Sequence, residues 1–146
     1  MNIRSRRFRR AATRALATGH HTAVVVIDVV QPVPAQFPRI LRGCVPPSGR
    51  VGRLADDEFA VLLSHLAFPD QAYDVAGNIA AALSPIIVNG RLVPLAAAIG
   101  VAVSAPGELT AGELVDRARQ AMRRAQQVGP QTRWAVWQEV SPPSAA

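Results

Sequence analysis

Residues 22–30 form a near-continuous run of β-branched apolar residues, and this run constrains the fold more than any other stretch. Such a run is typical of a strand that is buried on both faces, so it predicts a central strand of a sheet. Asp28 interrupts it, and a lone carboxylate there needs a partner, a metal ion or a place at the strand's exposed end. Pro32 and Pro34 then end the strand, because proline has no N–H to donate to the ladder.

The other elements follow from hydrophobic periodicity and turn residues. Helices are predicted at residues 3–17, 37–43, 69–83 and 110–128. Strands are predicted at residues 51–54, 59–63, 86–88, 92–103 and 134–140. The order βαββαβ after a first helix predicts an α+β fold, with a central, mostly antiparallel sheet of about five strands and helices packed against one face.

We interpret residues 1–146 as a single domain, with an Arg-rich helix in residues 1–19 and a loose tail at residues 141–146. Asn89-Gly90 predicts a type I′ turn between two short strands. Thr110 and Glu113 have the spacing of a capping box, which predicts the start of the last helix.

The chain has a formal net charge of +6, and all 16 of its basic residues are arginine. Six arginines lie within the first fourteen positions: Arg4, Arg6, Arg7, Arg9, Arg10 and Arg14. Such a segment is either the solvated face of a helix or a contact surface for nucleic acid or an anionic membrane. The single cysteine, Cys44, excludes an internal disulfide, and the start lacks the apolar segment of a signal peptide, so we expect a cytoplasmic protein.

An acidic hairpin lies in the middle of the chain. The predicted strands 51–54 and 59–63 are joined by Ala55, Asp56, Asp57 and Glu58, and Phe59 follows directly. This arrangement predicts a β-hairpin that carries carboxylates at its tip.

The hairpin resembles that of the GGDEF domain of diguanylate cyclases. Two further stretches resemble the same family: residues 95–102, which are similar to its Ser-Ile-Gly-Val-Ala strand, and residues 110–129, which are similar to its last helix. The likeness covers residues 22–140, in the family's order and spacing. It implies the palm-like fold that this family shares with nucleotidyl cyclases and polymerases.

The resemblance also implies a chemistry, in which two facing subunits each hold one GTP and condense the pair into cyclic-di-GMP. Divalent metal would neutralise charge on the triphosphate and activate the attacking hydroxyl. Asp28, Asp57 and Glu58 stand at the family's acidic positions, so Asp28 and Asp57 could share Mg²⁺. The alternative is a solvated hairpin tip beside a capped strand end.

Other family positions are altered. Ala55 and Asp56 replace two glycines, which let the triphosphate lie against backbone N–H groups. Gln126 replaces a phosphate-binding lysine, and Pro130 replaces an arginine. The stretch between Asp28 and the hairpin is short, and the upstream Arg-x-x-Asp motif of product inhibition is absent. We therefore expect little GTP binding and no cofactor.

The leading hypothesis is a degenerate, catalytically inactive GGDEF domain that acts in regulation, as a homodimer or with another protein. The alternative is a sensor of a nucleotide or other small ligand, or an enzyme that reuses the altered pocket, with residual diguanylate cyclase activity included. Trp134 and Trp137 predict one core side chain and one exposed anchor for a partner.

Overall fold

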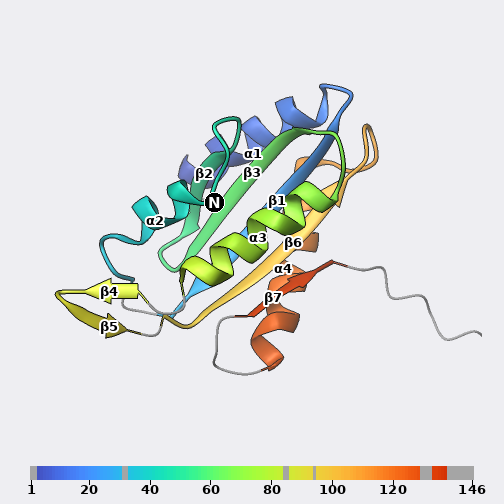
Figure 1. Ribbon diagram of the computed structural model, residues 1–146. Helices are drawn as coiled ribbons and strands as arrows, with labels where there is room; N and C mark the ends of the chain where they lie inside the picture. Colours follow the sequence, from blue (N-terminus) through green and yellow to red (C-terminus); the bar gives the residue numbers. More distant parts are fainter. Residues whose placement is uncertain (1–2, 31–32, 84–85, 94, 129–132, 138–146) are drawn as a thin grey trace, which may run out of the picture.

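The computed structural model describes residues 3–30, 33–83, 86–93, 95–128 and 133–137 (Figure 1). The helices are α1 (Ile3–Leu16), α2 (Phe37–Gly43), α3 (Asp70–Ala82) and α4 (Ala111–Val128). The strands are β1 (His21–Val29), β2 (Arg50–Ala55), β3 (Glu58–Leu66), β4 (Ile86–Val88), β5 (Arg91–Val93), β6 (Ala97–Ser104) and β7 (Arg133–Val136).

The central sheet has five strands in the order β2-β3-β1-β6-β7. Strand β1 pairs antiparallel with β3 on one side and with β6 on the other, and β7 is parallel to β6. Strands β4 and β5 form a separate two-stranded hairpin beyond one end of this sheet (Figure 1). The predicted α+β fold with a mostly antiparallel five-stranded sheet is confirmed.

Helices cover both faces of the sheet, so the prediction that they cover one face is wrong. One apolar cluster joins α2 and α3 to Val25 and Ile27 of β1. The other joins α1 and α4 to Val24 and Val26. Successive side chains of a strand point to opposite faces, and β1 is apolar on both, so each face needs its own cover. The burial expected of this central strand is confirmed.

Helix α4 packs unusually close to β6, at Gly100. A Cβ atom at this position would lie 2.1 Å from the Ala118 carbonyl oxygen and 2.3 Å from the Met122 backbone nitrogen. Both neighbours are backbone atoms of α4, which cannot rotate away as a side chain can. Gly100 therefore sets the distance between the helix and the sheet.

The strand predicted at residues 92–103 is divided in the structure. Residues 91–93 belong to the small hairpin and residues 97–104 to the central sheet, and Pro94, which has no N–H to donate, stands between them in the sequence. The Asn89-Gly90 turn is confirmed, with φ of +50° and +76° at its two residues. Of the last predicted strand, residues 133–136 form β7, whereas residues 138–140 and the tail 141–146 lie outside the described residues.

None of the described helices combines the length and the apolar character that crossing a bilayer requires.

Candidate functional site at the β2–β3 hairpin

The acidic hairpin is built as the sequence predicts. Ala55 pairs with Glu58, so Asp56 and Asp57 alone form the turn between β2 and β3. Neither turn residue has a positive φ, so this backbone path does not require glycine. The replacement of two glycines by Ala55 and Asp56 is therefore compatible with the hairpin backbone. The added side chains would instead affect a ligand that approaches the turn from solvent.

The hairpin is anchored from within by Arg53 and Phe59. The Arg53 guanidinium donates hydrogen bonds to the carbonyl oxygens of Ala55 (3.3 Å) and Asp56, and it lies 4.9 Å from the centre of the Phe59 ring. Phe59 is buried and packs against Phe37 of α2, with ring centres 4.7 Å apart. Arg53 is thus engaged with the turn's own backbone.

Asp28 lies beside the hairpin turn, as predicted. It pairs with Glu58 in the β1–β3 register, and the Val29 N–H donates a 2.9 Å hydrogen bond to the Asp57 carbonyl oxygen. Partial burial raises the pKa of the Asp28 carboxyl above its ordinary value, and the nearby Asp57 carboxylate raises this pKa further. The two carboxyl groups therefore form an interacting pair at the end of β1.

Two side chains of α4 bind acidic groups of the site. The Gln126 amide donates a hydrogen bond to Asp28 Oδ2, and this contact lowers the Asp28 pKa in part. Arg119 Nε donates to Glu58 Oε1 at 2.7 Å, in a partly buried ion pair. Glu58 is thereby paired with a cation, although its charge still contributes to the raised pKa of Asp28.

These contacts bear on the predicted metal site. Among the described residues, no group of three or more His, Cys, Asp and Glu side chains is placed to hold a metal ion. The Asp28–Asp57 pair fits a hard cation, because its oxygens are suitable ligands and their mutual repulsion would be relieved. Mg²⁺ at Asp28, Asp57 and Glu58 stays a prediction, and Arg119 already occupies Oε1 of Glu58.

Arg119 and the contact of Gln126 with Asp28 are the features that sequence reasoning missed. The two residues lie seven positions apart, two turns of helix, and therefore share one face of α4. The seven-residue spacing of Arg119 and Gln126, in a chain with an acidic hairpin, was the signal in the sequence that could have predicted these contacts. Which of the acids each would meet depended on how α4 packs on the sheet.

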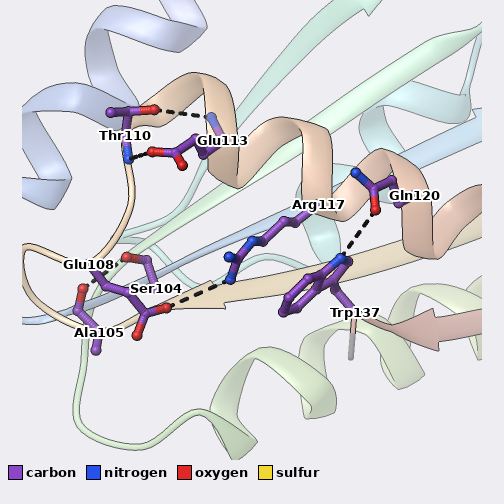
Figure 2. Close-up of polar contacts among 8 residues, drawn as sticks. All are labelled: Ser104, Ala105, Glu108, Thr110, Glu113, Arg117, Gln120 and Trp137. Atoms are coloured by element: carbon purple, nitrogen blue, oxygen red, sulfur yellow. Dashed lines mark hydrogen bonds and ion pairs between the residues drawn. The ribbon is translucent and has the colours of Figure 1, made fainter. Parts of the chain in front are cut away.

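The N-terminal half of α4 is held by polar contacts at its start and along the side that faces Trp137 (Figure 2). Thr110 and Glu113 form the predicted capping box: the Thr110 N–H donates to Glu113 Oε1 at 3.1 Å, and the Glu113 N–H donates to Thr110 Oγ1 at 3.2 Å. The hydrogen bonds from Thr110 hold the pKa of the Glu113 carboxyl below its ordinary value. The capping box is confirmed.

Trp137 packs against α4 and the apolar cluster beneath it. Arg117 lies over its ring at 3.9 Å from the centre, and the indole N–H donates to Gln120 Oε1 at 3.4 Å (Figure 2). Trp134 is 40% exposed, whereas Trp137 is half-buried. One tryptophan thus lies against the core and the other faces solvent, as predicted.

The arginines of α1 lie mostly on the solvent side of the helix. Phe8, Ala11, Ala12 and Ala15 are buried against the sheet, while Arg6, Arg7, Arg10 and Arg14 are exposed and Arg9 is half-buried. The Arg4 side chain lies outside the described set. Binding of nucleic acid or an anionic membrane by this face stays a prediction.

Comparison with known proteins is consistent with this geometry. Residues 34–132 match the family described as diguanylate cyclase, GGDEF domain. The solved GGDEF domain of YfiN (also TpbB) from Pseudomonas aeruginosa is 27% identical, with a TM-score of 0.80 over 92% of this chain and 96% of that chain. The comparison with curated proteins gave no match.

Two more distant structures share the fold. The active GGEEF domain of a diguanylate cyclase from Vibrio cholerae is 15% identical, with a TM-score of 0.76 over 92% of this chain and 97% of that chain. The diguanylate cyclase SiaD of Pseudomonas aeruginosa, solved in complex with its activator SiaC, is 19% identical, with a TM-score of 0.71 over 88% of this chain and 55% of that chain. Because the family match spans more than half of the sequence, the chain belongs to the GGDEF family.

Proposed function

We propose that this chain is a degenerate GGDEF domain without diguanylate cyclase activity, which acts in the cytoplasm as a regulatory, protein-binding module. The observation that carries the proposal is the charge of the hairpin site. Asp28, Asp56 and Asp57 contribute carboxylates, while two arginines beside the hairpin already have partners: Arg119 is ion-paired with Glu58, and Arg53 donates to backbone carbonyls.

A triphosphate would add negative charge to this site. Two unit charges about 4 Å apart repel by roughly 1 kcal/mol in water and about 4 kcal/mol at an intermediate dielectric. Asp56 is exposed, and by the resemblance to GGDEF domains it replaces a glycine that lets the phosphates approach backbone N–H groups. The Gln126 amide, bound to Asp28, supplies no positive charge. The site therefore opposes GTP twice, through repulsion and through loss of the phosphate cradle.

The direct test is the formation of cyclic-di-GMP from GTP and Mg²⁺ by the purified protein. We expect none, and product formation would overturn the proposal. Calorimetric titration with GTP and Mg²⁺ should show partial recovery of binding in Asp56→Gly and in Gln126→Lys. Gln127→Lys is the matched control, because it adds the same charge at the neighbouring exposed position of α4. Equal recovery of GTP binding in Gln127→Lys would mean that the added positive charge, and not its position at residue 126, restores binding.

Protein binding needs an exposed apolar surface, and the β4–β5 hairpin offers one. Ile87 and Leu92 pair directly across it, and they are 66% and 70% exposed. Cross-strand partners lie on the same side of a hairpin, so the two side chains form one patch. That SiaD is solved with an activator protein supports a similar use of the present domain.

Light scattering of the purified protein tests the homodimer. Ile87→Ser with Leu92→Ser should shift a dimer to monomer, while Val128→Ser, at a 70% exposed position of α4, should not. A dimer that survives the double substitution would exclude this patch as the interface.

The alternative function is a sensor or enzyme that reuses the pocket for a less charged ligand. The observation that favours it is the Asp28–Asp57 pair, because a carboxyl group with a raised pKa beside a second carboxylate is typical of ligand and catalytic sites. A thermal-shift panel of nucleotides and metal ions tests it. An unchanged melting temperature throughout would exclude this alternative.

A further inference from the structure

A cavity of about 410 Å³ lies along β2, an edge strand of the central sheet. The described residues that line it include Arg50–Arg53 of β2 but neither Asp28 nor any of residues 55–58. It adjoins the hairpin site through Arg53 and Phe59, which anchor the hairpin, but it contains none of that site's acidic residues. Its volume falls within the range of small-molecule sites, roughly 300–1,000 Å³.

The cavity reaches both faces of the sheet around the free edge of β2. Gly52 pairs with Ala60, which belongs to the cluster under α1 and α4, whereas Val51 pairs with Val61, which belongs to the cluster under α2 and α3. Cross-strand partners share a face, so α1 forms one wall and α2 the other. An edge strand also presents unpaired backbone N–H groups to a ligand.

The base of the cavity is apolar and well fixed. Phe8 of α1 lies directly on β2, since a Cβ atom at Gly52 would come within 2.7 Å of the Phe8 ring. Phe59 lines the other side and is held by its contacts with Phe37 and Arg53. Both rings are only 2% exposed, so they fix the floor of the cavity from beneath, and the partly exposed Pro38 and Val51 supply apolar surface that a ligand can touch. This fixed floor limits the ordering that binding would require.

Three further arginines surround this apolar base: Arg7 from α1, Arg42 from α2 and Arg50 from β2. Each is exposed, and none forms an ion pair with a described residue. Like charges that converge on one cavity without counter-charges repel one another, and an anion there would relieve the repulsion. The guanidinium group is planar and suits two-point hydrogen bonding to phosphate or carboxylate.

We propose that this edge-strand cavity binds a small organic phosphate, whose phosphate group is held by Arg7, Arg42 and Arg50 and whose planar or apolar body lies against Pro38 and Val51. Such a ligand would bridge α1 and α2 across the free edge of β2. The proposal goes beyond the proposed function, because Arg7, Arg42 and Arg50 take no part in the acidic group of Asp28, Asp56 and Asp57.

The test is calorimetric titration of the full chain with phenyl phosphate, inorganic phosphate and phenol. Phenyl phosphate should bind more tightly than either fragment. Arg7→Gln and Arg42→Gln should each weaken its binding about tenfold, which corresponds to the loss of a charge-assisted hydrogen bond. Arg10→Gln and Arg39→Gln are the matched controls, because each removes the same charge at an exposed position of the same helix that does not line the cavity.

The controls should change the affinity less than about twofold, as expected of screened surface charges. Equal losses in controls and cavity variants, or no binding of phenyl phosphate at millimolar concentration, would overturn the proposal. Tighter binding of a hexaglutamate peptide or of phosphatidic-acid vesicles would also overturn it, in favour of a protein segment or a membrane. Asp56→Gly should leave phenyl phosphate binding unchanged. The titration therefore tests the cavity proposal, and the cyclase assay tests the proposed function, each without the other.

Discussion

The Gln126 side chain donates a hydrogen bond to the Asp28 carboxylate, which joins the C-terminal part of α4 to the end of β1 across 98 positions of sequence. The acceptor also faces Asp57, so one neutral amide stands beside two acidic groups. This contact supports the fold and leaves the carboxylate pair without a compensating positive charge from α4.

Asp28→Asn should stabilise the protein at neutral pH. The raised pKa of Asp28 means that the folded state favours the protonated carboxyl. Wild-type stability therefore falls as pH rises from below the unfolded-state pKa, about 4, through the higher folded-state value. Asparagine stays neutral and can still accept the bond from Gln126. The melting temperatures of the two proteins should converge in acid and diverge as pH rises.

Asp116→Asn is the control for this comparison, since Asp116 is exposed on α4. A control that gains as much stability as Asp28→Asn would attribute the effect to net charge.

Mg²⁺ should raise the melting temperature of the wild-type protein at neutral pH. A cation between Asp28 and Asp57 binds the folded state alone and relieves the repulsion between the two carboxyl groups. Asp28→Asn and Asp57→Asn should each abolish the increase, whereas Asp70→Asn at the start of α3 should retain it. An identical increase in all four proteins would contradict a site at this pair.

Gly100→Ala should destabilise the protein strongly. The added methyl would meet the backbone of α4 at 2.1 Å and 2.3 Å, so the helix would have to move from the sheet. Overpacking of this kind costs about 1–3 kcal/mol of unfolding free energy, or more. Gly77→Ala is the matched control, for which we expect the opposite sign, because a Cβ at this position of α3 meets nothing within 4 Å. Gly77→Ala should raise the free energy of unfolding by about 0.5–1 kcal/mol. Chemical denaturation measures both, and a similar sign for the two would contradict the packing argument.

Thr110→Ala should lower the free energy of unfolding by about 1 kcal/mol, because it removes the N-terminal cap of α4. The effect should also depend on pH through Glu113. The pKa of this carboxyl is lowered in the folded state, so its contribution is present above the unfolded-state pKa and is lost as pH falls through the folded-state value. Glu113→Gln should show a weaker pH dependence than wild type in acid. An unchanged pH profile would contradict a role for the carboxylate in the cap.

Local patterns in the sequence predicted the elements that depend on nearby residues. The β-branched run became the central strand, Asn89-Gly90 became a tight turn, and Thr110 with Glu113 became a cap. Each of these is decided within a few positions by backbone sterics, turn geometry or a short hydrogen bond. The hairpin was predictable for the same reason, since strand period and an acidic turn are both local.

The tertiary structure decided which groups meet. The pairing of Arg119 with Glu58 spans 61 positions, and the bond from Gln126 to Asp28 spans more. The two-sided cover of the sheet and the arginine-lined cavity depend on where α1 and α2 pack around β2. Such contacts between distant side chains follow from the packing of whole helices against the sheet, which the periodicity of one segment does not encode. The sequence by itself determined the helices, the acidic turn and most of the strands of a GGDEF domain, because these depend on nearby residues. Packing decided the electrostatic balance of the hairpin site.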